Sequence, residues 1–239
     1  MEINTINPAS FTGNLNAVIY DHNGNIVPQT ELYNFSEYKV LTSPELLDLN
    51  INIDKTKPTG YKPQGQDKYK ITLSKGPIEA DETFFIKRFK QSASEADIRQ
   101  GVYETLRKLF QKSVEAAKES KTSSENVALN VLDRNGNPIP QNKLEILKDC
   151  KKLSELYGLK ILVKPSDNFT FAIKSKTPYM VYLSRPLDEL KTVIKAEAPV
   201  LVDKGTSQTN LEREILEGIY SALINLTQKS AKAILEGKK

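Results

Sequence analysis

The chain is poor in the residues on which most enzyme and metal sites depend. Its 239 residues include one cysteine, one histidine and no tryptophan. Cys150 can form no disulfide within the chain, and alone it cannot build a tetrahedral thiolate zinc site. His22 has no second histidine with which to hold a metal and no partner that would complete a catalytic triad. We therefore predict no metal site and no cofactor, and we expect a reducing compartment such as the cytoplasm.

Segments that would cross or target a membrane are also missing. No apolar run approaches the length of a membrane span, and residues 1–13 lack the basic start and apolar stretch of a signal peptide. Glycine-rich phosphate loops and the Gly-x-Ser-x-Gly nucleophile turn are absent as well. The sequence thus predicts a soluble protein that is not an enzyme, although a site made only of Asp, Glu, Lys or Tyr would leave no motif.

What the chain does contain is an internal repeat. Residues 18–29 read VIYDHNGNIVPQ, and residues 130–141, 112 positions later, read NVLDRNGNPIPQ. Residues 101–113 (GVYETLRKLFQKS) correspond in the same way to residues 218–230 (GIYSALINLTQKS), 117 positions later. A spacing of this size is the length of a small domain. We therefore predict an α+β fold made of two tandem copies of one small domain.

Each copy is predicted to have an N-terminal β-hairpin, a helix, about three further strands and a long C-terminal amphipathic helix. The Asn-Gly steps at 23–24 and 135–136 indicate tight hairpin turns. Their Asp-x-Asn-Gly-Asn sequences begin like a calcium loop but lack its later glycine and glutamate. The predicted boundaries are a flexible N-terminal arm (1–14), repeat one (15–121), a linker (122–126) and repeat two (127–239).

The elements inside each copy are predicted from apolar periodicity and from helix start and stop signals. A helix is expected over residues 142–157 with Gly158 as its stop, and a shorter one over residues 44–47. Capping boxes at Ser92 with Glu95, and at Thr209 with Glu212, are expected to start the last helices. The expected strands are 49–53, 68–73 and 83–86 in the first copy, and 159–163, 168–173 and 199–202 in the second.

Two segments are predicted to occur in one copy only. Repeat one has a Pro-, Gly- and Lys-rich loop at residues 54–66, and repeat two has residues 178–198, which include an apolar run at 179–183 and a short helix expected at 186–196. Loops tolerate change and carry function, so we expect a specific partner to contact these segments.

Cations alternate with aromatic residues between Lys68 and Lys90, which could place them on one face of a sheet against nucleic acid. Alternation is also typical of any half-buried sheet with lysines outward. The order helix, three strands, long helix is similar to that of double-stranded-RNA-binding domains. That family carries a lysine-rich motif at the start of its last helix. Here the corresponding residues read SASEAD and TNLERE.

Two functions remain open from the sequence. The first is a non-catalytic interaction or assembly protein with a protein partner, in which the two copies imitate a symmetric dimer. The alternative is a nucleic-acid-binding protein that uses the lysine and aromatic sheet face of repeat one. The candidate contact residues for a protein or a nucleic acid are Lys68, Lys70, Lys87, Arg88, Lys90, Tyr179 and Tyr182.

Overall fold

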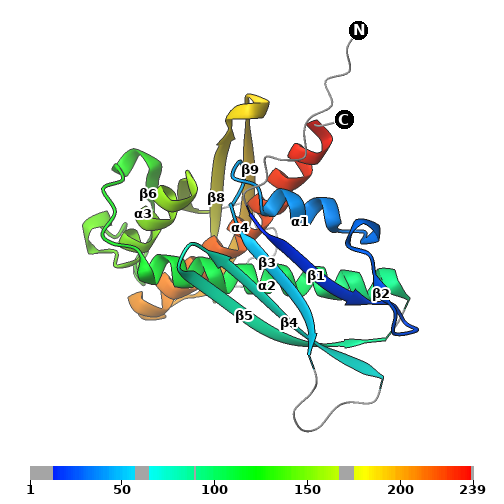
Figure 1. The fold of residues 1–239 in the computed structure, drawn as a ribbon. Coiled ribbons are helices and arrows are strands. Elements are labelled where there is room, and N and C mark those ends of the chain that lie inside the picture. Colours follow the sequence, from blue (N-terminus) through cyan, green and yellow to red (C-terminus); the bar gives the residue numbers. More distant parts are fainter. Residues whose placement is uncertain (1–12, 57–64, 89, 167–174, 238–239) are drawn as a thin grey trace. The chain divides into compact units, whose positions relative to one another are not determined.

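The computed structural model describes residues 13–56, 65–88, 90–166 and 175–237. It has the α+β fold that the sequence predicts, and these described residues form two sheets and four α-helices (Figure 1). The chain divides into two compact units: unit 1 comprises Met1–Lys112 with Ala231–Lys239, and unit 2 comprises Ser113–Ser230. The predicted N-terminal arm lies outside the described residues except for Gly13 and Asn14.

Unit 1 contains a five-stranded sheet in the order β2-β1-β3-β4-β5. β1 and β3 are parallel, and the other neighbouring strands are antiparallel. The parallel pair requires a crossover, which α1 provides. The elements are β1 (Leu15–Tyr20), β2 (Ile26–Val27), α1 (Phe35–Leu41), β3 (Asn50–Thr56), β4 (Gln66–Lys75), β5 (Ile78–Lys87) and α2 (Gln91–Ala116).

Unit 2 contains a four-stranded sheet in the order β6-β7-β8-β9. β6 and β7 are parallel, and the two later pairs are antiparallel. In place of a second hairpin strand, Leu132 and Pro138 form an isolated antiparallel bridge. The elements are β6 (Val127–Leu129), α3 (Ile146–Tyr157), β7 (Lys160–Pro165), β8 (Lys176–Leu187), β9 (Thr192–Asp203) and α4 (Gln208–Gly237).

Each sheet has one face buried against a helix. Alternate strand residues are buried, such as Ile51 and Ile53 in β3 and Ile161 and Val163 in β7, because side chains along a strand point to opposite faces. Side chains of β4 and β5, such as Ile71 and Phe84, lie under α2. Side chains of β8 and β9, such as Val181 and Val200, lie under α4. The opposite face of each sheet, here called its open face, carries the exposed and half-exposed residues of the strands.

The Asn-Gly segments form turns that are closed by an aspartate. Oδ1 of Asp21 accepts hydrogen bonds from the N–H groups of Asn23 (2.9 Å) and Asn25 (2.8 Å). Oδ1 of Asp133 accepts the corresponding bonds in unit 2, both at 2.8 Å. These bonds lower the pKa of both aspartates, led by the N–H of the second asparagine in each turn. The carboxylates are therefore used to shape turns.

The glutamates of the predicted capping boxes have a different role. Glu95 Oε2 accepts the N–H of Tyr33 at 2.7 Å, and Glu212 Oε2 accepts the N–H of Ile146 at 2.8 Å. In both cases the first glutamine of the helix, Gln91 or Gln208, donates to the other carboxylate oxygen. Each carboxylate thus ties a distant segment to the start of the last helix. The cap of α4 is Ser207, which accepts the N–H of Asn210 at 3.3 Å, so the prediction of Thr209 was wrong.

Replacing Glu212 with alanine is expected to lower the free energy of unfolding by about 1 to 2 kcal/mol, because the buried N–H of Ile146 loses its acceptor. Glu212→Gln supplies an amide oxygen that can accept the same N–H, so its loss of unfolding free energy should be much smaller. Urea unfolding of both variants measures the difference. Equal losses would show that the acceptor of Ile146 does not matter.

Three local predictions were wrong. Residues 44–47 form a turn, and the helix of this region is the earlier α1. Residues 186–196 do not form the expected helix: they comprise the end of β8, a 3₁₀ turn at Asp188–Leu190 and the start of β9. The run 179–183 is no insertion: it lies in β8, the strand placed in its sheet as β4 is in unit 1. The strand expected at 168–173 lies outside the described residues.

Candidate functional site

Two of the cations predicted as contacts in unit 1, Lys70 and Arg88, form ion pairs with acidic neighbours. Lys70 on β4 forms an ion pair with Asp81 at 3.3 Å. Arg88 binds Asp67 at 2.8 Å, and Lys55 binds the same carboxylate at 3.1 Å. Asp67 is buried, which opposes its ionisation, but Arg88 and Lys55 hold its pKa below the ordinary value. Arg88 therefore helps to keep a buried charge in place.

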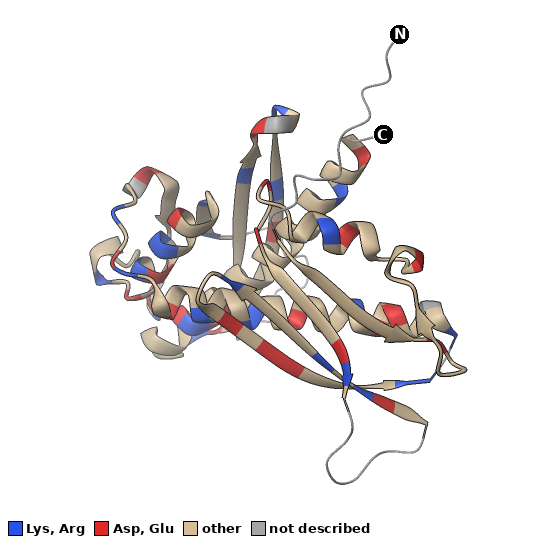
Figure 2. Ribbon diagram, in the orientation of Figure 1, with Lys and Arg blue, Asp and Glu red and all other residues tan. Residues whose placement is uncertain are grey.

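The aromatic residues between Lys68 and Lys90 do not share one face. Tyr69 is buried, and its hydroxyl oxygen accepts the N–H of Tyr20 at 3.2 Å. Phe84 lies against Gly101 of α2. Phe85, 46 % exposed, is on the open face opposite Lys68 in the strand register. Lys87 and Lys90 are exposed. Acidic residues also lie along β5 (Figure 2), so the open face of unit 1 has mixed charge.

The two tyrosines predicted as contacts lie in unit 2 on opposite faces of the sheet. Tyr179 is 1 % exposed, and its hydroxyl oxygen accepts the N–H of Leu132 at 3.2 Å, as Tyr69 does for Tyr20. It is a core residue and is closed to a partner. Tyr182 lies on the open face, where its ring centroid is 5.2 Å from the ammonium nitrogen of Lys164.

The sequence did not predict the open face of unit 2 as a binding surface, although Tyr182 on it was a candidate contact. Leu162 and Tyr182 are opposite each other in the β7–β8 register, and Met180 and Pro199 are opposite each other in the β8–β9 register. Leu201 is 39 % exposed. A hollow of about 410 Å³ includes Ala128, Leu162 and Tyr182 on this face. The face therefore combines apolar side chains with a concave surface, as binding sites do.

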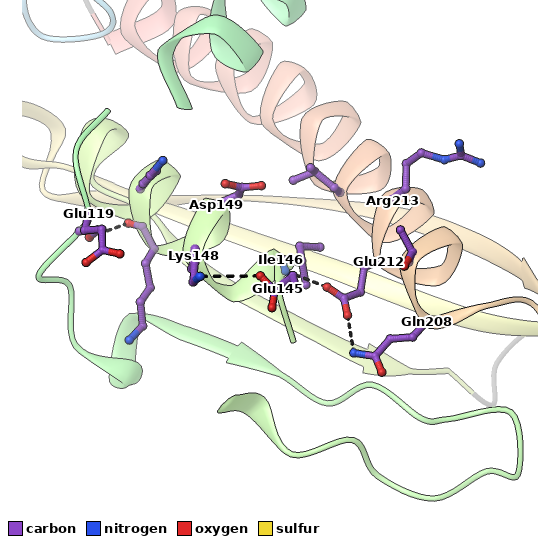
Figure 3. A pocket seen from close by; sticks show the side chains of 13 residues that line it. Glu119, Glu145, Ile146, Lys148, Asp149, Gln208, Glu212 and Arg213 are labelled. Carbon is purple, nitrogen blue, oxygen red and sulfur yellow. Dashed lines mark hydrogen bonds and ion pairs between the residues drawn. The ribbon is translucent and has the colours of Figure 1, made fainter. Parts of the chain in front are cut away.

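A larger pocket, of about 800 Å³, lies in unit 2 between α3, the first turns of α4 and Glu119–Ser120 (Figure 3). At its base, Glu212 joins Ile146 to Gln208 through the two hydrogen bonds described above. Burial raises the pKa of Asp149, and the charge of Glu115 raises it further, although Lys152 opposes both effects. The Lys152 ammonium donates to the carbonyl of Val114 at 3.0 Å.

The charges that line this pocket are mixed, and they select no class of ligand. Glu119, Glu145 and Asp149 are accompanied by Lys148 and Arg213, among others. Within the described ranges, no group of three or more His, Cys, Asp or Glu side chains could hold a metal ion. No helix in the same ranges is both long and apolar enough to cross a membrane. The pocket is therefore a weaker candidate than the open face of unit 2.

Comparison with known proteins adds no relative. No protein family model matches the chain, and no curated protein matches it.

Proposed function

We propose that this chain is a non-catalytic interaction or assembly protein, built from two copies of one domain, that meets a protein partner through the open face of unit 2. The observation that carries the proposal is the set of apolar side chains on that face. Leu162, Met180 and Tyr182 lie on interior strands, and Leu201 adds to them at the edge. Leu201 is exposed and the other three are half-buried, and partly exposed apolar side chains that gather in one place are typical of interaction sites.

Contacts that occur at matching places in both units support the two-copy part of the proposal. Glu95 and Glu212 each bind the N–H of a segment that follows a 3₁₀ turn. Lys112 donates to the carbonyl of Glu79 at 2.9 Å, and Lys229 donates to that of Lys195 at 3.1 Å. These pairs join the same elements in each unit, helix to sheet edge and helix to turn. A shared ancestor domain explains such agreement in detail.

The edges of the sheets are less suited to a partner than the faces. β5 is an edge strand of unit 1 and carries Glu79 and Asp81. β9, the long edge strand of unit 2, contains Pro199, which has no N–H to offer to an added strand. Charges and prolines are the usual devices that prevent pairing at an edge. This favours a contact made by side chains over one made by backbone.

The proposal is tested by a pair of matched substitutions. Leu201 on the open face and Leu156 on α3 are 39 % and 40 % exposed. Leu201→Asp is expected to reduce capture of the partner at least tenfold after cross-linking and affinity purification from cells, whereas Leu156→Asp should leave it unchanged. Both variants must first show the melting temperature of the unaltered chain. Equal capture by the two variants would contradict the proposed surface.

The second candidate function, nucleic-acid binding by unit 1, is favoured by one observation. Phe85 is exposed opposite Lys68 on the open face, with Lys70 two positions along the same strand, so one ring could stack on a base beside cations. Fluorescence polarisation with single- and double-stranded RNA and DNA at two salt concentrations tests it. Binding with a steep salt dependence that Phe85→Ala weakens would support this function. Unchanged binding in that variant, or none in the unaltered chain, would dismiss it.

A further inference from the structure

The open face of unit 2 is basic at the end nearest the β8–β9 connection. In the strand register, Lys160, Ser184 and Lys195 form one row across β7, β8 and β9. The next row holds Leu162, Tyr182 and Glu197. Both lysines are exposed. The row of Lys160 and Lys195 therefore carries two cations and no acid. The acids of this end lie outside that row: Glu197 is in the next row, and Glu125 lines the same hollow.

The open face of unit 1 is acidic at the corresponding end, nearest the β4–β5 turn. Its first row is Asn50, Ser74 and Glu79, and its second is Asn52, Thr72 and Asp81. Glu79 and Asp81 are exposed. These six described residues include no cation, but Lys70 of the following row forms an ion pair with Asp81 at 3.3 Å, so the negative charge of this end lies mainly on Glu79. The two rows therefore present negative charge and hydrogen-bonding groups where unit 2 presents lysines.

From this complementarity we infer that the occupant of the open face of unit 2 is a second copy of this chain. The open face of unit 2 docks along the open face of unit 1, with the end that contains Lys160 and Lys195 against the end that contains Glu79 and Asp81. This inference rests on the proposed function, since it names the partner for the same surface. The two surfaces differ, so the contact is heterologous and each added copy leaves one open face of each kind. The product is a ring or a linear chain of copies.

The size of the faces sets the strength of this contact. With strands about 4.8 Å apart and a rise of about 3.3 Å per residue, the sheet of unit 2 presents on the order of 500 Å² of planar area. Stable interfaces bury roughly 800 Å² on each partner. The contact is therefore small for a permanent complex, and we expect it to form reversibly at protein concentrations on the order of micromolar or above. It also weakens with salt, because exposed charges are screened.

Charge exchange between the faces tests the inference. One variant carries Lys160→Glu with Lys195→Glu, and the other carries Glu79→Lys with Asp81→Lys. Sedimentation velocity of the full chain at increasing concentrations should show reversible association of the unaltered chain. Each variant alone should remain a monomer or associate at least tenfold more weakly, since both of its faces then have one sign. An equimolar mixture of the two variants should associate again, because opposite faces are restored.

Two results would overturn the inference. One is an unaltered chain that stays monomeric at every concentration. In that case, if Leu201→Asp abolished capture of a different protein, the proposed function would stand and the second copy would be excluded as the partner. The other is association of both variants as strongly as the unaltered chain, which would remove these faces from the contact. Circular dichroism of each variant before sedimentation confirms that the exposed substitutions leave the fold intact.

Discussion

Alanine in place of Leu106 or Leu223 is expected to lower the free energy of unfolding by about 2 to 5 kcal/mol at each site. Leu106 lies on α2 and Leu223 on α4, and the two side chains are 0 % and 2 % exposed. Removing three carbon atoms from a filled core loses their transfer from water and leaves a cavity whose walls lose contacts. The sequence places both leucines on the apolar stripe of their helices, so the test also examines that stripe.

Urea unfolding followed by circular dichroism measures the loss. Asn225→Ala on α4 serves as the control, because this side chain is exposed and its removal should change stability by less than about 0.5 kcal/mol. The units could unfold in separate transitions, in which case each variant should shift only one of them. A loss below about 0.5 kcal/mol at either leucine would contradict the buried face assigned to that helix.

Gly218→Ala is expected to destabilise the protein by about 2 to 3 kcal/mol, even though alanine favours helices more than glycine by about 1 kcal/mol. Gly218 is in the middle of α4, and an added Cβ atom would overlap Cγ2 of Val200 on β9. Neither the helix nor the valine can move freely, because both are packed in the core. Steric overlap therefore outweighs helix propensity.

A second substitution distinguishes steric overlap from any other cause. Val200→Ala removes the atom that the new Cβ would meet, so Gly218→Ala combined with Val200→Ala should lose less than the sum of the single losses. Gly101→Ala in unit 1 should cost less than Gly218→Ala, since its nearest neighbour, at 2.7 Å, is the end of the Ile71 side chain. An increase in stability for Gly218→Ala would show that α4 lies farther from β9 than described.

The sequence predicted the fold class and the long helices because those features depend on local signals. Apolar residues at helical spacing identified α3, and its left-handed end at Gly158 follows from the same segment. Glu95 and Glu212 were recognised as helix-start residues, but their true acceptor roles toward Tyr33 and Ile146 depend on segments more than 60 positions away. No local pattern could reveal a partner so distant in the chain.

The candidate site was predicted less well, for a related reason. Alternation of lysines and aromatics in β4 and β5 was visible, but the direction of each ring depends on which face the helix covers. Tyr69 and Tyr179 proved to be buried, and only Tyr182 of the predicted tyrosine contacts is on an open face. The short helix expected over residues 186–196 did not form, because the pairing of β8 with β9 decided the outcome.

The most direct test of the central claim, that the open face of unit 2 makes the contact, is the thiol reactivity of single cysteines introduced on it. The natural Cys150 is fully buried, and burial raises the pKa of its thiol, so it should react slowly with maleimide. Leu201→Cys and Leu156→Cys would each place one comparably exposed thiol, on the open face and on α3. At low protein concentration the two should react at similar rates. At concentrations where copies associate, Leu201→Cys should react at least tenfold more slowly and Leu156→Cys should be unchanged, and equal rates for both in the associated protein would contradict the account.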